Sequence, residues 1–166
     1  MKMTIVDLPY PKIDKVQDLH SANVISLAYA TLQGELTATL QYVFQHFQFE
    51  EIDPEDADVM MGISLAEMHH FDLLGQSILT LGGQPTMVQY PNSKVWYNTS
   101  AVSQATKPQK MLMDDIVGEM GAIECYQKML QVLKNEQVSA LIERIILDEQ
   151  LHLQILKKLL EKYSKE

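Results

Sequence analysis

Glutamate and histidine residues recur in this sequence at spacings that suit metal binding. Glu67 and His70 are separated by two residues, and so are Glu149 and His152. Residues three apart lie on one face of a helix, so each pair can bind a single ion. One such pair alone is weak evidence, because a Glu-x-x-His pair also arises by chance on solvent-exposed helices.

A solitary glutamate precedes each pair by about the length of a helical hairpin, at Glu35 and at Glu119. Both glutamates open the same short phrase, with alanine three residues later and tyrosine seven residues later, at Tyr42 and Tyr126. The sequence therefore contains an internal duplication of four carboxylates and two imidazoles. Two matching copies are much harder to attribute to chance than one pair.

A four-helix bundle can bring such residues together around two metal ions. Mixed carboxylate and imidazole ligands suit iron, manganese or zinc better than metals that prefer thiolates. Four carboxylates and two neutral imidazoles carry four negative charges, which two divalent ions neutralise. We therefore predict two iron ions, or two manganese ions, per chain. The predicted ligands are Glu67 and Glu149 as bridges, Glu35 and His70 for one ion, and Glu119 and His152 for the other.

Four helices are expected to position these ligands. The first is expected to begin between Asp14 and Ser21 and to run to about Phe47. The others are expected from Pro54 to the Gly82-Gly83 pair, from Pro108 to about Leu133, and from about Glu136 to Lys162.

Local signals mark several helix ends. Asp53 can cap the second helix, and Pro54 suits the first helical position because its missing N–H needs no partner there. Asn135 can end the third helix and cap the fourth. Along the first helix, Leu32 and Glu35 are expected to share the face that carries the metal ligand.

The segments outside the helices determine the expected connectivity. Residues 1–13, which contain Pro9 and Pro11, are expected to form an irregular arm, and residues 84–107 a crossover. A helix of about 28 residues is about 42 Å long, and an extended crossover at about 3.3 Å per residue can span that length. Short links make the consecutive helices of each hairpin antiparallel. We therefore predict one all-α domain over residues 1–166, a ferritin-like four-helix bundle of two antiparallel helical hairpins joined by a long crossover.

Composition argues against several classes of protein. A net charge of −9 argues against nucleic-acid binding, which depends on neutralising phosphates with Lys and Arg. No segment approaches the roughly 18 consecutive apolar residues of a membrane span, and Met1 to Asp7 contain a lysine but no apolar stretch of signal-peptide length. Cys125 is the only cysteine, which excludes an intrachain disulfide. A cytoplasmic location is therefore expected.

Three segments carry a resemblance to a known family. They are Glu35-Leu-Thr-Ala-x-x-Gln-Tyr42, Ala66-Glu67-Met68-His69-His70 and Asp148-Glu149-x-x-His152. Together they resemble the ferritin-like diiron-carboxylate superfamily, especially bacterioferritin, rubrerythrin and a branch of uncharacterised bacterial ferritin-like proteins. The resemblance covers residues 21–162, and it specifies the six ligands without specifying one activity.

The resemblance implies roles for some further residues. Tyr42 matches a tyrosine beside the dimetal site of bacterioferritin, and the alternative is a core tyrosine; its repeat mate Tyr126 has a weaker claim. Met68 falls where bacterioferritin has a haem-ligating methionine, but we expect a packing role and no haem. Asp148 either orients a ligating histidine or is an ordinary exposed aspartate. His69 is expected to point away from the site.

The chain also departs from these relatives. Rubrerythrin has a cysteine-ligated iron module that supplies electrons, which a chain with only Cys125 cannot form, so a redox cycle would use an external electron donor. Bacterioferritin has a fifth helix that helps to close its cage, whereas here the residues after His152 only complete the fourth helix. We therefore expect a homodimer.

The sequence leaves several functions open. The first hypothesis is an oxidoreductase whose two ions react with O2 or H2O2, either as a ferroxidase or as a peroxidase or catalase. The second is a non-catalytic protein that binds or sequesters iron or manganese. A third is a bundle in which a fixed ion, such as zinc, only stabilises the fold. Enzymatic activity is therefore not decided by the sequence.

Overall fold

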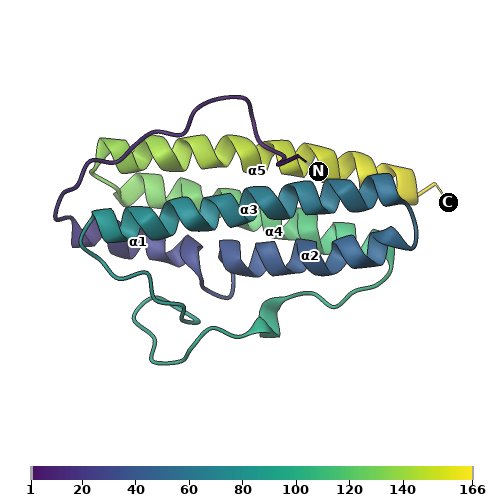
Figure 1. Ribbon diagram of the computed structural model, residues 1–166, viewed down its shortest axis with the longest axis horizontal. Helices are drawn as coiled ribbons and strands as arrows, with labels where there is room; N and C mark the ends of the chain where they lie inside the picture. The colour runs from purple at the N-terminus through teal and green to yellow at the C-terminus, as the bar shows by residue number, and fades with distance from the viewer. Residues whose placement is uncertain (1, 166) are drawn as a thin grey trace.

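The computed structural model describes residues 2–165, which form a bundle of helices (Figure 1). The helices are α1 (Leu19–Tyr29), α2 (Glu35–Glu50), α3 (Pro54–Thr80), α4 (Pro108–Val132) and α5 (Glu136–Tyr163), with one 3-10 turn, η1 (Thr99–Ala101). Within residues 2–165, β pairing is limited to an isolated bridge between Val88 and Trp96. The predicted all-α class is therefore confirmed.

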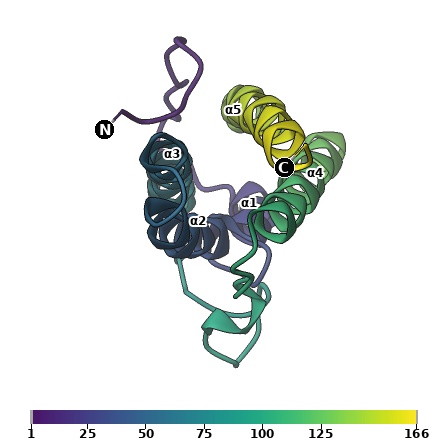
Figure 2. The ribbon, with the colours of Figure 1, turned by 90° about the vertical axis from the view of Figure 1, so that its right-hand side faces the viewer.

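Two antiparallel hairpins make up the bundle. Helices α1 and α2 pack against α3, and α4 packs against α5. Figure 2 shows the two hairpins facing each other, with the segment between α3 and α4 passing below α2. This crossover joins the hairpins along the length of the bundle, as predicted.

The predicted helix caps are present. The side chain of Asp53 accepts a hydrogen bond from the Glu55 amide at 3.0 Å, and Pro54 is the first residue of α3. The side chain of Asn135 accepts from the amides of Gln137 and Val138 at the start of α5. These caps depend on neighbouring residues alone, which is why the sequence predicts them well.

The predicted first helix is wrong in one respect, because a turn at residues 30–34 divides it into α1 and α2. The Thr31 hydroxyl donates to the Leu27 carbonyl at 2.7 Å, and the Leu32 amide donates to the Gln89 carbonyl of the crossover at 3.3 Å. Leu32 therefore lies in the turn and does not share a helical face with Glu35.

Glycine at position 34 permits this turn. A Cβ atom on Gly34 would lie 2.5 Å from the Ala28 carbonyl oxygen, so a larger residue would push the end of α1 away. Gly34 precedes the first residue of α2, which is Glu35. Glu35 thus lies in the first turn of a helix, where the positive end of the helix dipole favours a carboxylate.

Apolar clusters surround the positions of the predicted ligands. In α3, buried Ile63 and Leu74 lie before Glu67 and after His70, and in α5 buried Ile145 and Leu156 flank the corresponding pair. These four side chains belong to two separate apolar clusters of the core. Burial of both clusters fixes α3 and α5 along their axes, so the polar residues between them remain at one level.

The N-terminal arm crosses the bundle over α3 and α5, on the side opposite the crossover (Figures 1 and 2). The Thr4 amide donates to the Gly62 carbonyl at 2.9 Å. The Arg144 guanidinium donates to the carbonyls of Val6 and Leu8. The arm is irregular, as predicted, but specific hydrogen bonds hold it in place.

None of the helices within residues 2–165 combines the length and the apolar character that crossing a membrane requires.

Two helical glycines allow a test of how the arm packs. A Cβ atom on Gly62 would lie 2.5 Å from the Thr4 hydroxyl and 2.9 Å from the Lys2 carbonyl, whereas one on Gly118 meets nothing within 4 Å. We expect Gly118→Ala to raise the free energy of unfolding by about 0.5–1 kcal/mol. Gly62→Ala should give no such gain, because the arm must move. Urea denaturation of the two variants measures the difference, and equal gains would contradict this packing.

Candidate metal centre

The six predicted ligands lie together inside the bundle, and each is at most 4% exposed. Two sets of four side chains each place ligand atoms within 4.8 Å of one another. The sets are Glu35, Glu67, His70 and Glu149, and Glu67, Glu119, Glu149 and His152. Glu67 and Glu149 belong to both sets, which is the arrangement expected of bridging ligands. The cluster fits a dimetal site, while the role of each side chain as a ligand remains a prediction.

Both imidazoles direct Nδ1 toward the two shared carboxylates. Nδ1 of His70 is 3.0 Å from Glu149 and 3.4 Å from Glu67. Nδ1 of His152 is 2.9 Å from Glu67 and 3.7 Å from Glu149. Despite these short distances, neither Nδ1 has a partner with hydrogen-bonding geometry within residues 2–165, nor does one oxygen each of Glu67 and Glu149. Buried polar atoms rarely lack partners, and metal ions would satisfy all four.

The contacts of Nε2 determine which ring nitrogen of each neutral histidine carries the proton. Nε2 of His152 lies 2.8 Å from the Thr4 carbonyl, which can only accept a hydrogen bond, so this nitrogen carries the proton. Nε2 of His70 lies 3.1 Å from the carboxylate of Asp148. In the neutral rings the lone pairs are therefore on Nδ1 and point into the cluster, as metal ligation requires.

The two halves of the duplication differ at this outer contact. Asp148 precedes Glu149 in α5, but the matching residue before Glu67 in α3 is Ala66. His152 consequently has no aspartate partner, and the Thr4 carbonyl of the arm takes that place. The contact between the arm and His152 was not predicted, because every residue type has a backbone carbonyl and the sequence does not show which one is used. The available signal was the unequal pair Ala66 and Asp148.

Asp148 is fully buried, which rules out the alternative of an exposed aspartate. It accepts hydrogen bonds from the Val6 amide at 2.7 Å and from the Tyr10 hydroxyl at 2.6 Å, and it pairs with Arg144 at 2.8 Å. Burial raises the pKa of this carboxyl, but hydrogen bonds from His70, Arg144 and Tyr10 outweigh that effect and lower it to about 2. Asp148 is therefore a charged group that holds His70 in orientation.

The two repeated tyrosines contact the cluster in matching ways. The hydroxyl of Tyr42 donates to Glu119, and the hydroxyl of Tyr126 donates to Glu35. Both tyrosines are buried. Each repeat thus orients the solitary glutamate of the other repeat. The family resemblance implied a weaker role for Tyr126 than for Tyr42, but the structure gives the two tyrosines equivalent contacts.

Protons balance the charge of the cluster when metal is absent. Burial first, and then the neighbouring carboxylates, raise the pKa of Glu35 and of Glu119 well above the usual value. Burial lowers the pKa of the two imidazoles, but their carboxylate partners outweigh it and raise the pKa well above the usual range. Metal ions must displace these protons, so binding is expected to release protons and to weaken at low pH.

Other residues singled out in the sequence lie outside the cluster. Met68 is 49% exposed on α3. His69 packs against the ring of Tyr10, with the ring centroids 4.9 Å apart, and so points away from the cluster as expected. Cys125 is partly buried on α4 and faces the cavity described next.

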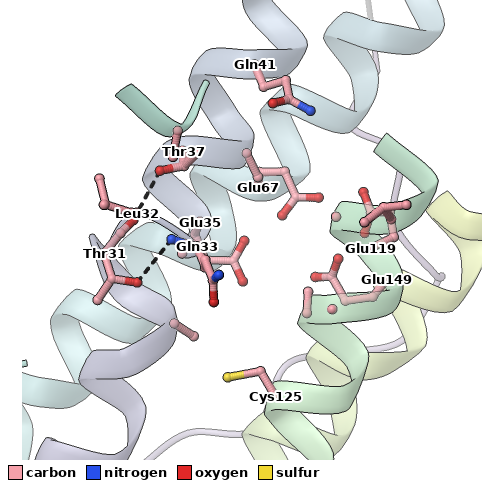
Figure 3. Close-up of a pocket in the computed structure, with 18 of the residues that line it drawn as sticks. Thr31, Leu32, Gln33, Glu35, Thr37, Gln41, Glu67, Glu119, Cys125 and Glu149 are labelled. Atoms are coloured by element: carbon pink, nitrogen blue, oxygen red, sulfur yellow. Dashed lines mark hydrogen bonds between the residues drawn. The ribbon is translucent and has the colours of Figure 1, made fainter. Parts of the chain in front are cut away.

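A cavity of about 660 Å³ connects the cluster with the surface. Figure 3 shows the carboxylates of Glu35, Glu67, Glu119 and Glu149 reaching into it from the two hairpins. Exposed side chains, including Tyr90 and Val117, line its outer part. The turn between α1 and α2 forms one wall of the cavity. Because the sequence predicted a continuous helix in place of this turn, it did not predict the cavity. The arm covers the α3–α5 side of the bundle, while the cavity opens between α2 and α4.

Comparisons with known proteins identify similar chains. The sequence model of the ferritin-like domain family matches residues 27–165. The bacterioferritin of Desulfovibrio desulfuricans is 30% identical over 136 residues, which cover 80% of this chain and 71% of the relative. A solved structure of a bacterioferritin from that organism, described as having a diiron site in different catalytic states, is 31% identical, with a TM-score of 0.71, and covers 89% of this chain and 81% of its own.

A manganese catalase from Anabaena has the same fold at 19% identity. The TM-score is 0.85, and the match covers 95% of this chain and 78% of the catalase. The predicted ferritin-like bundle is therefore confirmed.

Another buried carboxylate lies on α4, one helical turn before Glu119. Asp115 is 1% exposed and accepts hydrogen bonds from the side-chain amides of Gln41 at 2.8 Å and Gln45 at 2.7 Å. Burial raises the pKa of Asp115 to about 7, although the two amides act to lower it. Asp115 is therefore a buried acid that titrates near neutral pH.

Replacing Asp115 with asparagine is expected to flatten the pH dependence of stability of the metal-free protein. The pKa of Asp115 is about 7 in the folded protein and ordinarily 3.8, so the folded state binds an extra proton between these values. The free energy of unfolding therefore falls as pH rises through this range, by about 4 kcal/mol at about 1.4 kcal/mol per unit of pKa. Urea denaturation in the presence of a chelator, from about pH 4 to about pH 8, measures the change.

Asp114→Asn is the matched control. Burial raises the pKa of Asp114, but hydrogen bonds from Lys110 and Ser103 lower it below its ordinary value, so this carboxyl does not contribute a loss of stability on ionisation. The control should keep the steep pH dependence of the wild type. If the free energy of unfolding depended on pH equally in the wild type and in Asp115→Asn, ionisation of Asp115 would not destabilise the folded state.

Proposed function

The chain belongs to the ferritin-like domain family, as its sequence resemblance predicted, and we propose that the six-residue cluster binds two iron or manganese ions. One observation carries the proposal: two sets of ligand atoms share Glu67 and Glu149, and each set directs an unpartnered histidine Nδ1 inward. Four carboxylates and two neutral imidazoles match the charge of two divalent ions. Carboxylate and imidazole donors suit iron and manganese.

We further propose that the protein is an oxidoreductase that uses O2 or H2O2, as a ferroxidase or as a peroxidase or catalase. A pair of bound iron or manganese ions supplies electrons by changing between divalent and trivalent states. The diiron site described for the bacterioferritin of Desulfovibrio desulfuricans supports iron, while the fold shared with a manganese catalase motivates testing manganese as well. The cavity supports the access of a small oxidant to the cluster.

The residues of the chain have separate tasks in this proposal. Tyr42 and Tyr126 hold the carboxylates of Glu119 and Glu35. Asp148 holds the ring of His70, and the arm performs the same task for His152. A further catalytic role for Tyr42 is part of the proposal, because its hydroxyl lies within the cluster and faces the cavity.

Three broader features also belong to the proposal. An external donor would supply electrons, since the chain has one cysteine and so no cysteine-ligated iron module. A homodimer is supported by exposed apolar side chains along α4, namely Met113, Val117 and Met120. A cytoplasmic location is supported by the absence of cysteine pairs from the sequence.

Oxidation of bound iron tests the oxidoreductase proposal. Ferrous iron is added to metal-free protein without oxygen, and the complex is then mixed with O2 or with H2O2 while absorbance is followed. We expect rapid oxidation of two irons per chain, and the faster oxidant identifies the substrate class. A parallel sample loaded with Mn2+ and given H2O2 tests for catalase-type oxygen release. Tight binding without reaction in any sample would instead support a sequestration protein.

Replacing single glutamates tests the assignment of ligands. Glu67→Ala or Glu149→Ala should impair binding of both ions, because each residue belongs to both ligand sets. Glu35→Ala should impair one ion only, since Glu35 belongs to one set. Glu124→Ala is the control, because Glu124 is exposed and, within residues 2–165, pairs only with Lys128. Isothermal titration with Mn2+ counts the ions, and two ions retained by Glu67→Ala would refute the assignment.

A further inference from the structure

The cavity between α2 and α4 is much larger than the proposed oxidants require. Its volume of about 660 Å³ is about twenty times the roughly 30 Å³ that one molecule of liquid water occupies, and H2O2 is only slightly larger than water. Pockets of about 300–1,000 Å³ are typical of sites that hold small organic molecules. Access of O2 or H2O2 to the cluster therefore does not account for the size of the cavity.

Much of the cavity wall is made of small or apolar residues. Leu27 and Ala28 line it from α1, Ala38 from α2, and Val117 and Ala122 from α4. Water molecules beside such side chains find few hydrogen-bond partners. An apolar occupant would release this water and cover apolar surface, which is favourable.

Several polar side chains that line the cavity already have partners within the chain. The hydroxyls of Thr31 and Thr37 donate to the backbone carbonyls of Leu27 and Thr31, at 2.7 Å and 3.1 Å respectively. The side-chain amide of Gln41 donates to Asp115 and accepts from the backbone of the crossover. These groups need no hydrogen bond from an occupant, so the cavity suits a molecule that is largely apolar.

The charged groups around the cavity favour an uncharged molecule. Among residues 2–165, those that line the cavity include no lysine, arginine or histidine, so a bound anion would be buried without a partner. The ions proposed for the cluster neutralise its four carboxylates. The other acids of the lining, Asp114 and Asp115, already accept hydrogen bonds from neighbouring side chains. The cavity therefore provides neither a free cation for an anionic molecule nor an unpaired acid for a cationic one.

Two glycines of α4, Gly118 and Gly121, also line the cavity. Glycine within a helix is destabilising relative to alanine. A Cβ atom on either glycine would meet nothing within 4 Å in the rest of residues 2–165, so packing of the chain does not require glycine here. Residues four apart share a helical face, so Gly118 lies between Asp114 and Ala122, which line the cavity as well. The missing side chains leave room for an occupant from outside the chain.

We propose that the cavity binds an uncharged, largely apolar organic molecule, with one end beside the dimetal cluster. The four carboxylates of the cluster line the same cavity, as Figure 3 shows. A molecule that fills the cavity would therefore lie next to the proposed ions. Its access to the ions rests on the proposed function, whereas its binding does not.

Two fluorescent probes test the class of molecule. N-Phenyl-1-naphthylamine is uncharged, and 1-anilinonaphthalene-8-sulfonate adds a sulfonate to the same aromatic skeleton. Fluorescence titration of metal-free protein should show one uncharged probe bound per chain. The sulfonate should bind at least about tenfold more weakly, because its charge has no partner in the cavity. No binding of the uncharged probe, or equal binding of the two, would overturn the proposal.

Cys125 can report where the probe binds, because it is the only cysteine and lines the cavity. In Figure 3 its thiol points into the same space as the carboxylates. At about ten times its dissociation constant, the uncharged probe should slow alkylation of Cys125 by N-ethylmaleimide about tenfold, in proportion to the fraction of empty cavities. Mass spectrometry follows the reaction. An unchanged rate with the probe bound would place the probe outside the cavity and refute the site.

Gly118→Leu tests the room that glycine leaves. The leucine side chain would occupy part of the cavity, so the uncharged probe should bind about tenfold more weakly or less. The melting temperature should stay close to that of the wild type, because the added Cβ atom meets no other part of the described chain. Gln127→Leu is the matched control, since Gln127 is exposed on the same helix, away from the cavity. Equal affinities of the two variants would contradict the proposed site, and the alkylation of wild-type Cys125 tests it independently of any variant.

Metal loading tests the position beside the cluster. Mn2+ is paramagnetic and Zn2+ is not, so NMR signals of the bound probe should broaden in protein loaded with Mn2+ and not in protein loaded with Zn2+. Equally sharp signals with both metals bound would overturn this position. A protein that binds the uncharged probe but no pair of metal ions would overturn the dimetal proposal and leave the organic site standing. Two bound ions without probe binding would do the reverse.

Discussion

The burial of four carboxylates and two imidazoles in one place is the constraint on which the rest of this structure depends. Like charges in a low-dielectric interior repel strongly, so the cluster must hold protons or cations to exist at all. Apolar residues on both sides of each Glu-x-x-His pair keep α3 and α5 in register. Hydrogen bonds from Tyr42 and Tyr126 then hold the two remaining carboxylates in position. The core thus stabilises an arrangement that would be unfavourable without bound cations or protons.

The internal duplication produces a site with approximate twofold symmetry that is broken at its periphery. Both imidazoles direct Nδ1 inward, but a charged aspartate orients His70 while a neutral backbone carbonyl orients His152. The difference arises at one position of the repeat: Asp148 precedes Glu149 in the second copy, whereas Ala66 precedes Glu67 in the first copy. Two ions bound here would therefore have unequal surroundings, because a carboxylate behind an imidazole makes it a more basic ligand than a carbonyl does.

Access to the cluster depends on features outside the ligand-bearing helical segments. The arm covers the α3–α5 side, and the turn between α1 and α2 contributes one wall of the cavity on the α2–α4 side. Asp115, Gln41 and Gln45 lie along that second side and are tied to the crossover through Ser103. One side of the bundle therefore orients the histidines, and the opposite side provides the route from the surface.

The sequence by itself determined the all-α class, the helix caps at Asp53 and Asn135, and the six residues that meet at the centre. These features follow from local spacing, because helical periodicity places residues three and four apart on one face, and a cap needs only its neighbours. Only the tertiary structure decided the turn at Gly34, the contact of Thr4 with His152, and the cavity beside Asp115. Each of these depends on backbone atoms, or on segments distant in sequence that come into contact, and residue type and spacing carry little record of such contacts.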